Sequence, residues 1–156
     1  MSMTKTQYYT DIALTVAKKA TCLKKQYGAV IVKDDEVVST GYNGNPRGEP
    51  HCYVCTKCDS GKDIATFSTC KSVHAEMNCI ISASRKEMLG ADIYLAGWEA
   101  STDPEYTKQE IRDPRPCEIC LRLIKNAGIN RIINRTGIIY ERMDDGIMYC
   151  LKEPHD

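Results

Sequence analysis

The chain has 156 residues, of which 42% are hydrophobic and 27% charged. This size suits one globular domain over residues 1–156. Basic and acidic residues number 21 each. This balance argues against a nucleic-acid partner, because proteins that bind nucleic acids usually carry an excess of basic residues. No apolar run reaches the roughly 20 residues of a membrane span, and no signal-peptide region is evident. We therefore expect a cytoplasmic protein without a membrane partner.

Nine cysteines are the unusual part of the composition. An odd number of cysteines without a secretion signal speaks against a disulfide framework. Most of them lie in CxxC-like spacing or close to a histidine. Metal binding is therefore the better interpretation.

The N-terminal half begins with an amphipathic pattern that predicts a helix over residues 6–25. Two β-rich runs, 28–32 and 36–40, flank a Lys-Asp-Asp turn and predict a hairpin. Residues 41–48 and 49–69 are typical of loops.

The second half alternates helices and strands, which implies parallel pairing in a layered α/β fold. We expect a helix from about His74 to Leu89 that Gly90 ends, and a helix over 117–127 that Pro116 opens and Gly128 ends. The other expected elements are strands over 92–96 and 131–134 and a final helix over 143–153.

Two short motifs, His74-Ala75-Glu76 and Pro116-Cys117-Glu118-Ile119-Cys120, each open a predicted helix. Cys117 and Cys120 stand at i and i+3, so their sulfurs share one face at a helix N-terminus. This end of a helix favours anions and lowers the pKa of a thiol. One imidazole and two thiolates form a three-ligand zinc site with a fourth position for water.

Glu76 lies two residues beyond the histidine, beside the predicted zinc but not needed to bind it. A carboxylate there can take a proton from the zinc-activated water and pass it to a ring nitrogen. Each motif alone is weak evidence, because HxE and CxxC occur by chance and a histidine at a helix start is often a cap. Together they form the H-x-E…P-C-x-x-C signature of zinc-dependent nucleobase deaminases.

From about Thr21 to Tyr140 the chain resembles the deoxycytidylate (dCMP) deaminases of the cytidine-deaminase superfamily. The resemblance implies a three-layer α/β/α fold with a central mixed sheet, and deamination of dCMP to dUMP and ammonia. It also implies a homo-oligomer such as a hexamer, a sugar contact from Asn43 and a base contact from the Ala75 backbone. Its marks are Thr21-Cys22, GAVIVKDD, GYNGNPRG, the run from Cys70 to Asn78, and PCEIC followed by residues 124–129.

Similar dCMP deaminases carry a second, structural zinc with ligands at the places of Cys22, Cys52 and Cys70. The fourth ligand would be Cys58 or Cys55, and we prefer Cys58. Free core cysteines are the alternative. We interpret Cys79 and Cys150, which fall in predicted helices, as small core residues.

Residues 97–113 are an insertion relative to that family, and we expect a long polar loop with Trp98 at its root. The loop could shape recognition of the nucleotide phosphate, with Arg115 or Arg112 as partner, or form a subunit contact or an ordered surface loop. For Arg115 itself, a solvated loop cation is the slightly favoured alternative.

Two other functions stay open. The same chemistry could act on cytidine, guanine or a tRNA adenosine, although the neutral charge weighs against tRNA. A non-catalytic zinc-ribbon-like module would use its CxxC pairs structurally, but it leaves the sequence His74-Ala75-Glu76 without a role.

Overall fold

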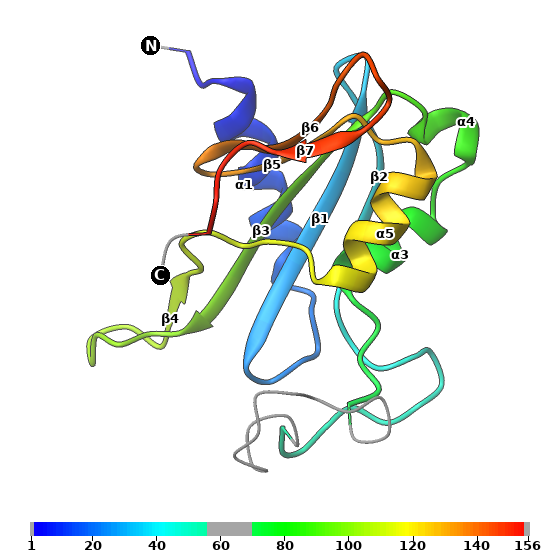
Figure 1. The fold of residues 1–156 in the computed structure, drawn as a ribbon. Helices are drawn as coiled ribbons and strands as arrows, with labels where there is room; N and C mark the ends of the chain where they lie inside the picture. The colour runs from blue at the N-terminus through cyan, green and yellow to red at the C-terminus, as the bar shows by residue number, and fades with distance from the viewer. Residues whose placement is uncertain (1, 56–69, 155–156) are drawn as a thin grey trace.

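The computed structural model describes residues 2–55 and 70–154 (Figure 1). Among these residues, none of the helices has the length and apolar character needed to cross a bilayer. The helices are α1 (Lys5–Ala17), α3 (Ala75–Ile81), α4 (Arg85–Met88) and α5 (Glu118–Ala127). The strands are β1 (Lys25–Lys33), β2 (Glu36–Tyr42), β3 (Asp92–Ala100), β4 (Lys108–Glu110), β5 (Arg131–Asn134), β6 (Gly137–Arg142) and β7 (Met148–Cys150).

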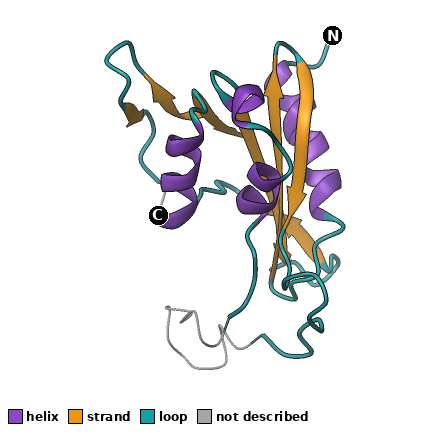
Figure 2. Ribbon diagram, turned by 90° about the vertical axis from the view of Figure 1, so that its right-hand side faces the viewer, coloured by secondary structure: helices purple, strands orange, loops and turns teal. Residues whose placement is uncertain are grey.

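The strands form one mixed sheet in the order β2-β1-β3-β5-β6-β7, with β4 beside β3. Strand β3 pairs parallel with β5, whereas the other pairings within the described residues are antiparallel. Figures 1 and 2 show α1 on one face of this sheet and α3 and α5 on the other. The predicted three-layer α/β/α fold with a mixed central sheet is confirmed, and so is the hairpin of β1 and β2.

Alternating side chains of the strands build a core on each face of the sheet. The α1 face buries Val30, Tyr94 and Ile133, and the opposite face buries their neighbours in sequence. Two glycines let the helices approach closely. A Cβ on Gly28 would lie 2.0 Å from the carbonyl oxygen of Ala13 in α1, and one on Gly41 would lie 2.4 Å from that of Ala75 in α3.

Two predicted helices are shorter than expected. Helix α1 begins after the N-cap Thr4 and ends at Ala17, well before position 25, because the chain must turn there to enter β1. The helix predicted from His74 to Leu89 is two helices, since α3 ends at Ile81. Ser84 then caps α4, accepting a hydrogen bond from the backbone N–H of Glu87.

The helix predicted over residues 143–153 is wrong. The chain forms β6, turns through Gly146 with a φ of 84°, and returns as β7. The sequence Asp144-Asp145-Gly146 favours a turn, and this preference outweighs the helical spacing of the apolar residues. Cys150 is therefore exposed on a strand rather than buried in a helix, whereas Cys79 is fully buried as predicted.

The insertion over residues 97–113 is not simply a polar loop. Strand β3 pairs with β1 from Asp92 to Glu99, and β4 pairs with its last three residues, Trp98 to Ala100. The indole Nε1 of Trp98 donates a hydrogen bond to the carbonyl oxygen of Leu14 in α1, at 3.1 Å. Figure 1 shows the tip of this hairpin projecting away from the N-terminus of α5.

Candidate active site

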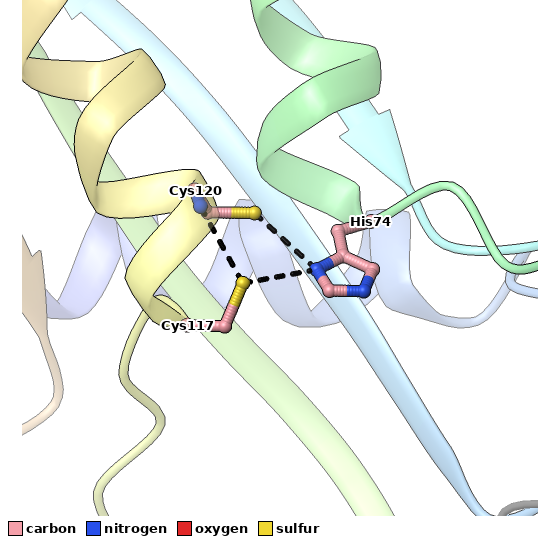
Figure 3. Close-up of side chains that lie close together, drawn as sticks. All are labelled: His74, Cys117 and Cys120. Carbon is pink, nitrogen blue, oxygen red and sulfur yellow. Dashed lines mark hydrogen bonds between the residues drawn. The ribbon is translucent and has the colours of Figure 1, made fainter. Parts of the chain in front are cut away.

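The N-termini of α3 and α5 meet above the same face of the sheet (Figure 3). His74 is the N-cap of α3 and Cys117 the N-cap of α5. Pro116 therefore precedes the cap instead of occupying the first turn, but Cys117 and Cys120 still stand on one helix end. The sulfur of Cys117 accepts a hydrogen bond from the backbone N–H of Cys120 at 3.4 Å. Gly128 ends α5 in the left-handed conformation, as predicted.

The structure brings His74, Cys117 and Cys120 together. The Nδ1 atom of the histidine lies 3.3 Å from the sulfur of Cys120 and 3.4 Å from that of Cys117, and both sulfurs point toward the ring (Figure 3). All three ligand atoms lie within 4.8 Å of one another. Ligands bound tetrahedrally to one zinc ion stand about 3.5–3.8 Å apart. The donor set and its spacing therefore fit zinc.

Glu76 is buried beside these three residues, with 6% of its surface exposed. Burial raises the pKa of its carboxyl group, while hydrogen bonds from its own backbone and from the Cys120 thiol act in the opposite direction. A carboxyl group with a raised pKa can hold and release a proton closer to neutral pH. The site thus combines a metal-ligand set with a proton carrier.

Burial also raises the pKa of the Cys120 thiol, with the nearby charges of Glu76 and Cys117 acting in the same direction. Loss of hydration on burial therefore acts against the lowering of this pKa that is expected at a helix N-terminus. A coordinated metal ion reverses the balance, since a ligating thiol loses its proton.

The loop that carries Asn43 lies next to the histidine motif. The backbones of Gly44 and Val73 exchange hydrogen bonds of 3.1 and 2.7 Å. The buried side chain of Asn43 accepts a hydrogen bond from the Tyr27 backbone N–H at 2.7 Å and donates one to the Lys25 carbonyl at 3.0 Å. Asn43 therefore ties this loop to the start of β1.

Tyr27 is a residue of this site that the motifs did not reveal. Gly28 faces α1, so Tyr27 faces α3 and α5 by strand alternation. Burial, and after it the charge of Glu76, raises the pKa of the Tyr27 phenol to about 12. Its hydroxyl has no hydrogen-bond partner within residues 2–55 and 70–154. The alternation along β1 was the signal that could have found it.

Arg115 is not a solvated loop cation. Its Nε donates to the Oδ2 atom of Asp113 at 3.0 Å, and only 12% of its side chain is exposed. Its Nη1 also lies 3.8 Å from the sulfur of Cys150. The neighbouring Arg112 is exposed.

The cysteines proposed for a second zinc gather only in part. The Cys22 sulfur lies 3.2 Å from the Oγ of Ser72. Burial raises the pKa of Cys22, and the nearby thiols of Cys70, Cys52 and Cys55 raise it further. Cys58 lies outside the described residues. Within those residues, the histidine and cysteines of the first site are the group that comes close enough to share one metal ion.

The sequence profile described as "Cytidine and deoxycytidylate deaminase zinc-binding region" matches residues 3–136 of this chain. The chain belongs to this family. Zinc binding is a property of the family, and the histidine and two cysteines described above agree with it.

Curated relatives of this deaminase-family chain include three proteins named deoxycytidylate deaminase. The protein of Mycobacterium phage D29 is 33% identical over 133 residues, which cover 81% of this chain and 91% of the phage protein. Those of Schizosaccharomyces pombe and Saccharomyces cerevisiae are 32% and 30% identical over 83% and 93% of this chain. The matches span only 36% and 41% of the two yeast proteins.

The deaminase fold is also found among solved structures. The dCMP deaminase of cyanophage S-TIM5 in its apo form matches with a TM-score of 0.58 and 20% identity, covering 86% of this chain and 84% of the phage chain. The same phage protein in complex with dCMP and dUMP matches with a TM-score of 0.56 and 21% identity. At this identity the likeness establishes the fold.

Proposed function

We propose that this chain hydrolyses dCMP to dUMP and ammonia, and that residues 1–156 act as one zinc-dependent deaminase domain. The observation that carries the proposal is the buried carboxyl group of Glu76 next to the convergent ligand atoms of His74, Cys117 and Cys120. The phage relative, which the chain matches over most of its length, carries the name deoxycytidylate deaminase and so supports the choice of substrate.

His74, Cys117 and Cys120 would hold the catalytic zinc. When bound there, zinc would supply a Lewis acid that makes a water molecule acidic enough to act as nucleophile near neutral pH. Because the chain supplies three ligands from two helix ends, a fourth coordination position would remain for water.

Glu76 moves the protons of the reaction. Its carboxylate accepts a proton from the attacking water and delivers it to N3 of the cytosine ring, which makes C4 easier to attack. The same carboxylate then takes the second proton from the hydroxyl added at C4 and passes it to the amino group, so that the C4–N bond breaks, C4=O forms, and dCMP and water become dUMP and ammonia. Its burial, which raises its pKa, favours this double role.

The substrate contacts proposed for Ala75 and Asn43 are those that the resemblance to the dCMP deaminases implies. The backbone of Ala75 would contact the pyrimidine edge and Asn43 the deoxyribose. Arg115 would reach the phosphate with the N–H groups that its pairing with Asp113 leaves over.

A second, structural zinc would be held by Cys22, Cys52 and Cys70, with Cys58 or Cys55 as the fourth ligand. The thiols of Cys70, Cys52 and Cys55 lie close enough to Cys22 to raise its pKa, which supports this grouping. The contact between Cys22 and Ser72 also brings the segment after α1 to the segment before α3. Such a zinc would tie the long loop of residues 49–69 to both.

The chain would work as a homo-oligomer, and a hexamer is the assembly that the resemblance suggests. Large apolar side chains on the helices of the site support this, because Ile81 is 75% exposed and Leu123 38% exposed. Sedimentation velocity on the purified chain tests the proposal, and a monomer at micromolar concentration would contradict it.

The deciding experiment measures ammonia release from a panel of substrates together with zinc content per chain. The panel holds dCMP, deoxycytidine, cytidine, guanine and a tRNA with a target adenosine. We expect turnover of dCMP above all others. Turnover of another member would keep the chemistry and change the substrate, whereas bound zinc without ammonia release from any of them would favour a non-catalytic zinc module.

A further inference from the structure

The segment that leads into the ligand turn lacks secondary structure of its own. Residues 111–116 connect β4 to α5 and contain no helix or strand. Cys117 follows directly and contributes a sulfur to the site. A connection of this kind has to be fixed by side chains if the sulfur is to keep one position.

Asn134 supplies that fixation from another part of the fold. It is the last residue of β5 and is completely buried. Its Nδ2 donates hydrogen bonds to the Oδ1 atom of Asp113 at 2.8 Å and to the carbonyl oxygen of Pro114 at 2.9 Å. Its Oδ1 accepts from the backbone N–H and the hydroxyl of Thr136 at 2.8 and 2.7 Å. Both amide protons and two acceptor positions are thus in use.

Arg115 holds the other oxygen of the same carboxylate. Its Nε lies 3.0 Å from Oδ2 of Asp113, and both side chains are nearly buried, with 12% and 13% exposed. The carboxylate of Asp113 therefore accepts one hydrogen bond from Asn134 on β5 and another from Arg115 in its own connecting segment. Three consecutive residues before Pro116 are engaged in this network.

We propose that Asn134 is a positioning residue for the metal ligand Cys117. It anchors residues 113 and 114 to the end of β5, so that the chain enters α5 with the Cys117 sulfur already 3.4 Å from Nδ1 of His74. The inference rests on the zinc site of the proposed function. Groups that orient metal ligands from outside the coordination sphere typically change metal affinity by about 10–100-fold when removed.

Three variants separate positioning from stability. Asn134→Ala removes the anchor. Asn134→Asp keeps the shape and the oxygen for Thr136 but replaces the donor group with an oxygen that repels Asp113. The matched control is Ile133→Ala, because Ile133 is also buried on β5 but packs on the α1 face of the sheet. It lowers the stability without touching the ligand segment.

The measurement is zinc affinity by competition with a chromophoric chelator, at a temperature where circular dichroism shows every variant folded. We expect affinity to fall at least about 10-fold in both Asn134 variants and to stay within about 2-fold of wild type in the Ile133 control. Equal losses in all three would overturn the proposal. If the Asn134 variants do not fold, Arg115→Gln gives a milder test: the zinc affinity should fall below that of wild type, and an unchanged affinity would overturn the proposal.

Amide hydrogen exchange in the metal-free chain supplies a readout that needs no zinc. The Cys120 amide, bonded to the Cys117 sulfur, should exchange faster in Asn134→Ala than in Ile133→Ala. Equal rates would contradict the positioning role. A wild-type chain that binds no zinc would instead contradict the proposed function, and the exchange rates would still show whether Asn134 holds the turn.

Discussion

The Nδ1 atom of His74 lies 3.3 Å from the sulfur of Cys120, although the two residues are 46 positions apart in the sequence. Two different helices bring them together, and each helix is placed by the sheet beneath it. Gly41 lets α3 lie directly on β2, while Ile124 and Ala127 seat α5 on the same core. The geometry of the site is therefore a property of the packing between layers.

Replacing Glu76 with glutamine should abolish turnover while zinc content and fold remain. The amide fills the same space but cannot carry protons between water, N3 and the leaving amine. General acid–base groups contribute roughly 10²–10⁴-fold, so the rate should fall at least about 100-fold. Steady-state ammonia release and zinc analysis on the same samples check this. A variant that retains more than about a hundredth of the rate would refute the role of Glu76.

His74→Ala and Cys117→Ser should each lose one zinc ion per chain and all measurable activity. A three-ligand site that loses one ligand binds zinc with too few donors. Metal analysis after dialysis against a weak chelator measures the loss, and Cys79→Ser serves as the matched control, since that buried thiol contacts Ser39 and is not among the three grouped metal ligands. Full zinc content in the His74 variant would contradict the assignment.

Cys52→Ser and Cys70→Ser should lower the melting temperature and release a second zinc ion, with the catalytic zinc retained. A structural zinc contributes folding free energy, which is lost with its ligand. Exposed Cys150 lies on β7, and its replacement by serine is the control. A protein with one zinc per chain, and with stability indifferent to Cys52 and Cys70, would leave the second site without support.

Tyr27→Phe should leave the stability of the protein nearly unchanged, because the hydroxyl has no partner within the described residues. If that hydroxyl binds the nucleotide, kcat/KM for dCMP should fall about 3–10-fold, the value of one uncharged hydrogen bond. Thermal melts and steady-state kinetics on dCMP measure both effects. An unchanged kcat/KM would show that the phenol serves the site only through its ring.

Tyr9→Phe should make the stability less dependent on acidic pH. The Tyr9 hydroxyl donates to Asp35 at 2.6 Å, and this bond, with Lys5 as a smaller cause, lowers the pKa of the aspartate below its ordinary value of 3.8. A lowered carboxyl pKa gives stability that is present above the ordinary value and is lost as the pH falls through the lowered one. Melting temperatures from pH 7 down to about 2.5 should drop more steeply for wild type, and parallel curves would contradict the coupling.

The site was more predictable from the sequence than the ends of the elements. The spacing of Cys117 and Cys120 and the position of His74 are local features of the sequence. They identify the ligands even where the predicted helix ends are misplaced. The break between α3 and α4 carried a readable signal, since Ser84 and Glu87 form a capping box. Strand β4 had none, because Lys108, Gln109 and Glu110 have no strand preference and are extended only through pairing with β3.

The hydrogen-bond network around Asp113 could not be predicted from the sequence, for a different reason. Its hydrogen bond with Asn134 joins residues 21 positions apart, and the local sequence pattern of neither segment predicts this contact. The assignment of Arg115 as a solvated cation failed on the same contact.

The hairpin of β3 and β4 has a consequence for any attempt to shorten it. Strand β5 pairs with β3 only at Asp92 to Tyr94, and β4 covers the same side further along, at Trp98 to Ala100. Deleting β4 would leave a stretch of bare strand edge with unpaired backbone groups, which invites pairing with another chain. Aggregation of a variant without this loop would therefore indicate that the edge of β3 has lost its cover. A shorter hairpin that keeps the three β4 residues avoids this effect.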